Sequence, residues 1–235
     1  MELVTGGAGF IGSHLVDALV EQGNKVRVID NFSSGREEFL SHHMSGDYVE
    51  IINGDLLDRE AIMSAMDGIE TVHHMAANPD IRLGTEVTDT DLKQGTIATY
   101  NVLEAMRLNE VGRISFASSS AIYGEASVMP TPESYGPVMP ISLYGASKLA
   151  SESLITAWGG TFGAKVFIHR FANIVGPRGT HGVIFDFIHK LKSNPNRLEV
   201  LGDGNQEKSY MSAHDCVRSM LHIVSMGEEG SVLYN

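Results

Sequence analysis

A tyrosine and a lysine lie four residues apart, at Tyr144 and Lys148, in a segment whose pattern predicts a helix. A separation of four residues places both side chains on one face of a helix. A free phenol has a pKa of about 10 and stays protonated at neutral pH, whereas a nearby ammonium group favours the phenolate. The pair therefore indicates a tyrosine that acts as a general base, although a surface pair on an ordinary helix would have the same spacing.

Three consecutive serines, Ser118–Ser120, stand where the predicted strand Arg113–Ser118 ends. Open α/β sheets bind their ligands at the carboxyl ends of the strands. A serine hydroxyl in this position could hold a substrate hydroxyl or keto group against Tyr144. The alternative is that these hydroxyls only cap the strand end or a turn.

Glycines at Gly6, Gly9 and Gly12 follow the first predicted strand and open the first predicted helix. They allow a tight turn and a close approach of the backbone to a pyrophosphate, and the helix N-terminus favours an anion. Asp30, at the end of the second strand, can accept hydrogen bonds from both ribose hydroxyls and would repel a 2′-phosphate, which favours NAD over NADP. Asp55 is either a contact for the adenine or a turn-forming aspartate, and its position favours neither role.

Short apolar runs alternate with segments of helical period, which is typical of a parallel sheet flanked by helices. We expect Gly159-Gly160 to end the last of the main helices. These patterns predict an α/β fold with a doubly wound, Rossmann-like parallel sheet over residues 1–175. The expected strands are Glu2–Thr5, Lys25–Asp30, Tyr48–Asn53, Ile69–Met75, Arg113–Ser118 and Lys165–Phe171, and the expected helices are Phe10–Gln22, Asp58–Met66, Asp91–Leu108 and Leu143–Trp158.

The pattern changes near residue 176, and residues 176–235 are expected to form a smaller substrate lobe. The expected elements there are a helix over Val183–Lys192, a short strand over Leu198–Leu201 and a helix over His214–Val224. The chain stops in an apolar, strand-like run, Val232–Asn235, so we expect this lobe to be truncated.

Composition excludes several other classes of protein. A length of 235 residues, 43% of them hydrophobic, supports a sizeable core. The count of 17 Lys and Arg against 29 Asp and Glu gives a net charge of −12, which disfavours a nucleic-acid partner. The apolar runs are too short for a membrane span, and we expect no signal peptide, because glycines begin at Gly6. A single cysteine, Cys216, fits a reducing, cytoplasmic setting. No metal site is expected, because paired histidines such as His73-His74 lack partners at ligand spacing.

Seven stretches together resemble the extended short-chain dehydrogenases/reductases that act on nucleotide sugars, in particular the UDP-glucose 4-epimerases. The resemblance covers essentially the whole chain. It is carried by Thr5–Gly12, Asp30–Gly35, Ala76–Pro79, Ser118–Gly124, Pro140–Lys148, Arg170–Asn173 and His181–Ile184.

The resemblance implies a role for each matching residue. The catalytic hydroxyl residue of this family lies four positions before the tyrosine of a Tyr-Gly pair, here Tyr123, which implies Ser119. Tyr144 would take the proton from the sugar O4 while a hydride passes from C4 to NAD, and Lys148 would hold the nicotinamide ribose. The 4-keto sugar would then rotate and take the hydride back on its other face. Residues implied to bind NAD are Gly6, Gly9, Phe10, Ile11, Gly12, Asp30, Asn31, Ser34, Gly35, Asp55, Leu56, Ala76, Ala77, Asn101, Tyr144 and Lys148, and those implied to bind substrate are Ser118, Ser119, Ser120, Tyr144, Asn173 and Lys208.

Two departures from the family pattern narrow the expected chemistry. Nucleotide-sugar 4,6-dehydratases carry an Asp-Glu pair directly after the active-site hydroxyl residue, where this chain has Ser120-Ala121. Without that acid, dehydration lacks its proton donor, and a decarboxylase that uses the same acid is disfavoured as well. Lys208 stands where the family usually has an arginine, so a phosphate would meet a point charge in place of a bidentate fork.

The expected function is therefore NAD-dependent 4-epimerisation of a nucleotide sugar, most simply UDP-glucose and UDP-galactose, by an isomerase. A UDP-N-acetylhexosamine or UDP-glucuronate 4-epimerase would share every motif. A non-catalytic NAD-binding sensor is the alternative from another class, but such relatives typically lose the tyrosine or the lysine. The resemblance also implies a homodimer that pairs the helices over Asp91–Leu108 and Leu143–Trp158.

Overall fold

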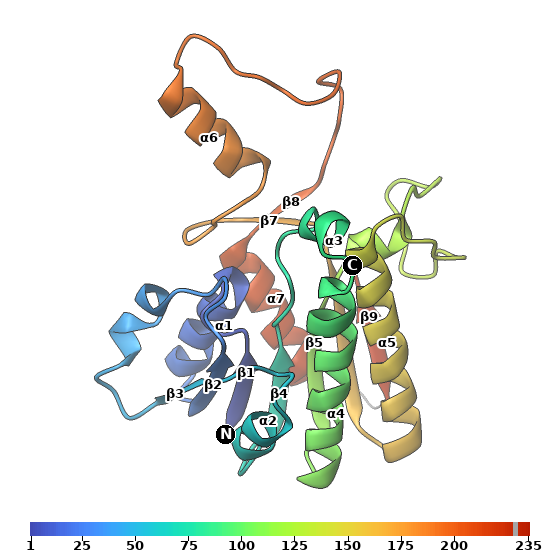
Figure 1. Ribbon diagram of the computed structural model, residues 1–235. Helices are drawn as coiled ribbons and strands as arrows, with labels where there is room; N and C mark the ends of the chain where they lie inside the picture. Colours follow the sequence, from blue (N-terminus) through green and yellow to red (C-terminus); the bar gives the residue numbers. More distant parts are fainter. Residues whose placement is uncertain (228–229) are drawn as a thin grey trace.

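A seven-stranded parallel sheet forms the centre of the molecule (Figure 1). The computed structural model describes residues 1–227 and 230–235. The strand order is β3-β2-β1-β4-β5-β6-β9, so the direction of winding reverses between β1 and β4. The predicted doubly wound α/β fold is confirmed. The strands of this sheet are β1 (Glu2–Thr5), β2 (Val26–Asp30), β3 (Val49–Asn53), β4 (Thr71–His74), β5 (Arg113–Ser119), β6 (Lys165–Phe171) and β9 (Ser231–Tyr234).

Helices cover both faces of the sheet. The helices are α1 (Phe10–Glu21), α2 (Arg59–Ala65), α3 (Leu83–Glu86), α4 (Ala98–Leu108), α5 (Leu143–Phe162), α6 (Val183–Ser193) and α7 (Ala213–Met226). Figure 1 shows α2, α4 and α5 on one face of the sheet and α1 and α7 on the other. Buried apolar side chains of the first group form one core against the sheet, and those of the second group form another. Cys216 of α7 is buried in this second core. Among the described residues, no helix is long and apolar enough to cross a membrane.

Two of the predicted helices differ from the observed ones. The helix α5 continues through Gly159-Gly160 and ends at Gly163, which adopts a left-handed conformation with φ of 76°. Gly159 is required for packing, because a Cβ there would lie 2.9 Å from the Val166 side chain. The predicted helix over Asp91–Leu108 is divided into a π-helical segment, Leu92–Ile97, and α4. Short 3₁₀ segments also form at Glu37–Phe39 (η1), Ser41–His43 (η2) and Ser120–Tyr123 (η4).

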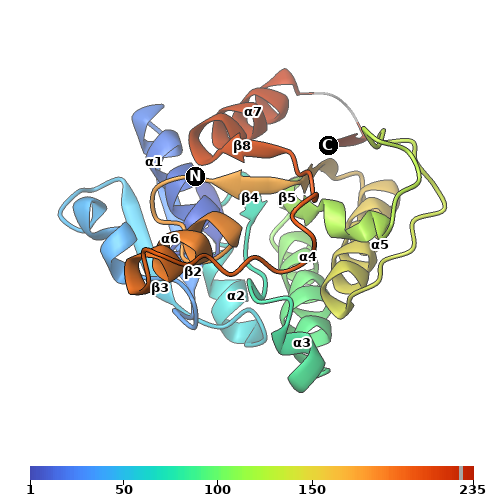
Figure 2. The ribbon, with the colours of Figure 1, turned by 90° about the horizontal axis from the view of Figure 1, so that it is seen from above.

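The segment that follows β6 forms a separate layer above the carboxyl edge of the sheet (Figure 2). It contains a parallel pair of short strands, β7 (Asn173–Val175) and β8 (Tyr210–Ser212), and the helix α6. The predicted strand over Leu198–Leu201 is wrong, because this exposed stretch pairs with no other strand. The division of the chain into two domains at residue 176 stays a prediction. This division assigns α7 and β9 to the small lobe, whereas both elements pack with the main sheet.

Candidate active site

A cavity of about 660 Å³ opens at the carboxyl edge of the sheet, where the winding reverses. Side chains from the turn after β1, from the ends of β2 to β5, from the start of α5 and from residues 171–181 line it. This is where open α/β sheets bind ligands. The sequence-predicted residues that line it are Gly6, Gly9, Phe10, Ile11, Gly12, Asp30, Asn31, Ser34, Asp55, Leu56, Ala76, Ala77, Ser118, Ser119, Tyr144 and Lys148.

The turn between β1 and α1 leaves no room for side chains at two of its glycines. Gly6 has φ of 68°, and a Cβ there would lie 2.7 Å from the backbone of Ala76. A Cβ on Gly12 would collide with the carbonyl oxygen of Gly6. The helix α1 begins at Phe10 with no side-chain cap, and Phe10, Ile11 and Gly12 of its first turn line the cavity. The turn therefore offers backbone donors and a positive helix end, which suit a pyrophosphate.

Asp30 ends β2 with both carboxylate oxygens turned toward backbone donors. Oδ2 accepts a hydrogen bond from the Ala8 amide at 2.9 Å, and Oδ1 accepts one from the Phe32 amide at 2.8 Å. Burial raises the pKa of Asp30, and these two hydrogen bonds act in the opposite direction. Each oxygen keeps a second lone pair for a ligand hydroxyl. Gly35 does not line the cavity, but a Cβ there would lie 2.8 Å from the Asp30 carboxylate, so this glycine makes room for Asp30.

Asp55 makes the turn contact and also lines the cavity, while its contact with the adenine stays a prediction. Its Oδ1 accepts a hydrogen bond from the Leu57 amide at 2.8 Å, which is a turn contact. Its Oδ2 accepts a hydrogen bond from Asn31 at 3.0 Å, and both side chains line the cavity. Asn101 lies outside the cavity, where its amide donates to the carbonyl oxygen of Leu56 at 2.9 Å. Asn101 thus supports the cavity wall from behind.

Tyr144, Lys148 and Ser119 come together at the end of the cavity nearest to β5 and α5. The helix α5 begins at Leu143, where the Ser142 hydroxyl accepts a hydrogen bond from the Gly145 amide and so caps the helix. The Lys148 ammonium donates to the carbonyl oxygen of Ala117 at 2.6 Å and lies 5.8 Å from the centre of the Tyr144 ring. The two side chains therefore share one face of α5, as their spacing predicts.

The protonation of this pair differs from the sequence expectation. Burial raises the pKa of Tyr144, which outweighs the lowering by a hydrogen bond with Ser119, and the buried carboxylate of Asp91 raises it further. Burial also lowers the pKa of Lys148 to about 8, against the opposing influence of Glu152 and Asp91. The expectation that Lys148 brings the pKa of Tyr144 below its usual range is wrong for this arrangement, because desolvation of the phenolate dominates.

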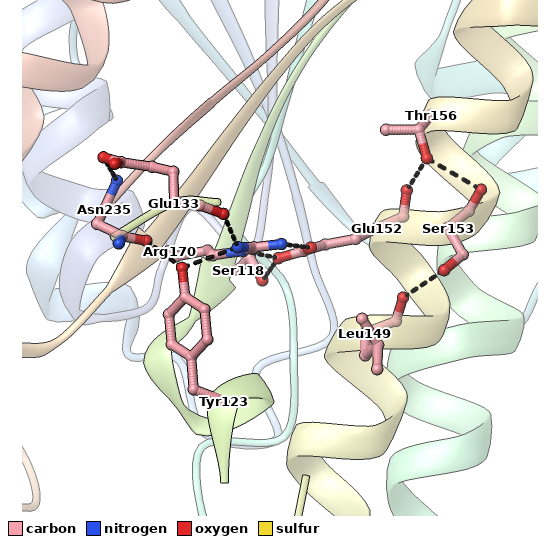
Figure 3. Close-up of polar contacts among 9 residues, drawn as sticks. All are labelled: Ser118, Tyr123, Glu133, Leu149, Glu152, Ser153, Thr156, Arg170 and Asn235. Atoms are coloured by element: carbon pink, nitrogen blue, oxygen red, sulfur yellow. Dashed lines mark hydrogen bonds and ion pairs between the residues drawn. The ribbon is translucent and has the colours of Figure 1, made fainter. Parts of the chain in front are cut away.

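A buried ion pair behind the cavity joins α5 to β6 (Figure 3). Arg170 binds Glu152 through two contacts, Nη2 to Oε2 at 2.7 Å and Nε to Oε1 at 3.0 Å. The Ser118 hydroxyl donates to Glu152 Oε1 at 2.5 Å, and Arg170 also donates to the Tyr123 hydroxyl at 2.8 Å. The network therefore fixes the end of β5, next to Ser119, against the helix that carries Tyr144.

Sequence reasoning assigned no role to Glu152, Arg170 or Asp91. Glu152 could have been found, because it follows Tyr144 and Lys148 at the same four-residue interval and so belongs to the same face of α5. Asp91 is 2% exposed and accepts a hydrogen bond from Asn78 at 3.1 Å. No pattern in the sequence distinguishes Asp91 from its acidic neighbours.

Three of the expected substrate residues lie away from the cavity. Ser120 is exposed at the start of η4, Asn173 donates to the carbonyl oxygen of Ser209 at 3.1 Å, and Lys208 is exposed on the segment before β8. Ser118 lines the cavity, but its hydroxyl is engaged with Glu152. The assignment of these four residues to the substrate stays a prediction. Thr180 and His181, to which the sequence assigned no role, line the cavity from the segment above the sheet.

A buried histidine supports the floor of the site between β4 and α4. His74 is 0% exposed, with Nδ1 at 2.7 Å from the Thr5 hydroxyl and Nε2 at 3.0 Å from the Thr99 hydroxyl. Thr99 donates to the carbonyl oxygen of Gly95, so Nε2–H is the donor of the neutral ring. Burial lowers the pKa of His74 to about 3 from an ordinary value of 6.5, with a smaller contribution from Lys148. A packed, non-ligating role for His73-His74 was expected.

This pKa predicts a loss of stability in acid. The unfolded chain binds a proton at His74 below pH 6.5, whereas the folded chain does so only near pH 3, so the free energy of unfolding falls as the pH drops through this range. The expected cost from His74 is about 2 kcal/mol at pH 5 relative to pH 8. Urea unfolding of the wild type and of His74→Asn at both pH values measures the difference. The exposed His222, changed to Asn, serves as the control, and an NMR titration that gives His74 a pKa near 6.5 would contradict the account.

Residues 2–235 match the model of the NAD-dependent epimerase/dehydratase family. A putative UDP-glucose 4-epimerase of Methanocaldococcus jannaschii is 34% identical over 235 residues, which is 97% of this chain and 75% of the relative. The UDP-glucuronic acid decarboxylase 1 of Xenopus tropicalis is 31% identical over 233 residues, which is 95% of this chain and 53% of the relative.

Solved structures share the fold as well. A crystal structure of a UDP-galactose 4-epimerase superposes with a TM-score of 0.88 at 43% sequence identity, and the match covers 99% of this chain and 76% of the other. Relatives with different reactions thus share this architecture, so the reaction has to be argued from the site itself.

Proposed function

The chain belongs to the NAD-dependent epimerase/dehydratase family, and within it we propose that it catalyses the 4-epimerisation of a nucleotide sugar, UDP-glucose to UDP-galactose and back. The observation that carries this proposal is the meeting of Tyr144, Ser119 and Lys148 in the cavity that the Gly6–Gly12 turn also lines. An isomerase of this kind needs one acid–base group and a bound redox cofactor in one enclosed space, and no metal.

The residues of the cavity fit NAD. The collisions that a Cβ would make at Gly6 and Gly12 leave bare backbone for a pyrophosphate, and Asp30 offers a carboxylate for a ribose diol. Lys148 would hold the second ribose, and Asn31, Asp55 and Leu56 would surround the adenine. When bound in its oxidised form, NAD supplies a hydride acceptor that can return the hydride.

The chain's own residues would manage the proton. Tyr144 would take the proton from the sugar O4 as the C4–H bond breaks, and would return it when the keto group is reduced. Ser119 would hold the same oxygen through a hydrogen bond. Lys148, with a pKa of about 8, is protonated in most molecules at pH 7. Its ammonium group lies 5.8 Å from the centre of the Tyr144 ring, and burial keeps the pKa of that tyrosine above its ordinary value.

Dehydration and decarboxylation are the competing reactions in the family. Both reactions are disfavoured because each would need an acid directly after Ser119. In this chain the residues there are Ser120 and Ala121. Ser120 is exposed and does not line the cavity. We therefore favour epimerisation, which needs no second acid.

Turnover with a panel of sugars tests the proposal. UDP-galactose, UDP-N-acetylglucosamine and UDP-glucuronate are each incubated with the chain and NAD, and the products are separated by chromatography. We expect UDP-glucose to form from UDP-galactose fastest. Faster turnover of either other sugar would move the assignment to the corresponding 4-epimerase. NAD binding without turnover of any sugar would favour a non-catalytic sensor.

Cofactor choice gives a second prediction, which concerns Asp30. The change Asp30→Asn removes the negative charge but keeps one acceptor oxygen, so we expect NAD to bind about 10-fold more weakly. Discrimination against NADP should fall, since the 2′-phosphate no longer meets a carboxylate. Titration calorimetry with both dinucleotides measures this, and the exposed Asp47, changed to Asn, is the matched control. Equal affinity of the wild-type chain for NAD and NADP would refute the assignment.

We further propose that two copies associate through α5 and the segment that leads into α4. The apolar side chains Leu92, Ile97, Leu143 and Phe162 are exposed there. A homodimer would cover them with the same residues of a second copy. Light scattering should give twice the chain mass at micromolar concentration, and a monomeric mass would contradict this proposal.

A further inference from the structure

A second group of chemically active side chains lies outside the cavity, between α1 and the 3₁₀ segment η2. Asp17 of α1 faces the 3₁₀ segment η2, which contributes His42 and His43. The Nε2 atoms of both histidines converge on one oxygen, Asp17 Oδ1, at 2.8 Å for His42 and 2.7 Å for His43. Two imidazoles and a carboxylate from separate elements thus share one point in space.

We propose that Asp17, His42 and His43 bind a divalent transition metal of the zinc type, which holds η2 against α1. Imidazole nitrogen and carboxylate oxygen are ligands that zinc takes readily, and three protein ligands leave a fourth position for water. The three ligand atoms lie within 4.8 Å of one another. In a tetrahedral zinc site with bonds of about 2.1 Å, ligand atoms are about 3.4 Å apart, so small side-chain rotations would complete the site.

The surroundings of Asp17 orient its carboxylate toward the histidines. Arg178 forms an ion pair with the other oxygen, Oδ2, at 2.8 Å, so Oδ1 is the oxygen that faces His42 and His43. The positive charge of Arg178 repels a dication, so we expect micromolar affinity.

The site would also join three parts of the molecule. Arg178 belongs to the loop after β7, and its neighbour Pro177 accepts a hydrogen bond from His14 of α1 at 2.9 Å. The same loop leads to Thr180 and His181, which line the cavity. A metal at Asp17 would therefore fix η2 and α1 beside the loop that closes one side of the cavity. No sequence pattern predicts this cluster, because Asp17 and His42 stand 25 positions apart.

Calorimetric titration of the tag-free chain with zinc chloride tests the proposal, and it does not depend on catalysis. We expect one zinc per chain, and affinity more than about 10-fold weaker in His42→Ala, His43→Ala and Asp17→Asn. His222→Ala, which removes an exposed histidine on α7, should bind zinc as the wild type does. Cobalt should give visible absorption bands of a nitrogen–oxygen site in the wild type and lose them in His43→Ala. Zinc binding that is absent, or that survives the loss of both histidines, would overturn the proposal.

Discussion

Replacement of Tyr144 by phenylalanine should reduce kcat about 1,000-fold while NAD still binds. The change removes one hydroxyl oxygen and keeps the ring, which shares a face of α5 with Lys148. A positioned acid–base group typically contributes between about 100- and 10,000-fold to a rate. Steady-state kinetics with UDP-galactose measures kcat, and calorimetry measures NAD affinity.

The control for this variant is Tyr48→Phe, because Tyr48 is 50% exposed and lies outside the cavity. It should leave both quantities unchanged. Ser119→Ala should lower kcat by a smaller factor than Tyr144→Phe, since the serine only holds the oxygen from which Tyr144 takes the proton. If Tyr144→Phe retains more than a tenth of the wild-type kcat, another residue is the base.

The second large effect concerns the buried pair of Glu152 and Arg170. Their side chains are only 6% and 8% exposed. Replacement of one partner leaves the other charge buried and unpaired, so Glu152→Gln should lower the free energy of unfolding by about 3–5 kcal/mol. The double variant Glu152→Leu/Arg170→Met leaves no charge behind and should recover most of that loss. Urea unfolding of the wild type, Glu152→Leu, Arg170→Met and the double variant measures the coupling, and Glu152→Gln is unfolded beside them.

Glu152 also positions residues of the active site, so its replacement should change the kinetics as well as the stability. Glu152 holds Ser118, the neighbour of Ser119, and its charge raises the pKa of the Lys148 ammonium. Glu152→Gln should therefore lower kcat more than it changes KM and should shift the alkaline side of the pH profile downward. Glu104→Gln, which breaks an exposed pair with Arg107, is the control and should change little. A double variant no more stable than Glu152→Gln would contradict this account of the pair.

Much of the fold follows from local patterns in the sequence. The alternation of β-rich runs with amphipathic helices predicts six of the strands of the sheet, since each buried strand carries its own apolar side chains. The Gly6–Gly12 turn and Asp30 are readable because they follow strands directly and lie at one edge of the sheet. Tyr144 and Lys148 are readable because a helix converts a spacing of four residues into a shared face.

Features that depend on distant contacts could not be predicted in the same way. The end of α5 at Gly163 depends on packing against β6, which competes with the Gly159-Gly160 signal. The strands β7 and β8 have only three residues each, too few for a pattern. The pKa values of Tyr144 and Lys148 follow from burial, and the ion pair with Arg170 and the cluster at Asp17 join residues far apart in the chain. Tertiary structure alone brings these together.

We propose that the chain oxidises and reduces the same sugar carbon without release of the hydride. UDP-galactose carrying deuterium at C4 tests this directly, in the presence of NAD and with mass spectrometry and NMR of the product. We expect UDP-glucose with deuterium still at C4 and no net consumption of NAD. Loss of the deuterium to water, or a product that has lost water or carbon dioxide, would contradict it.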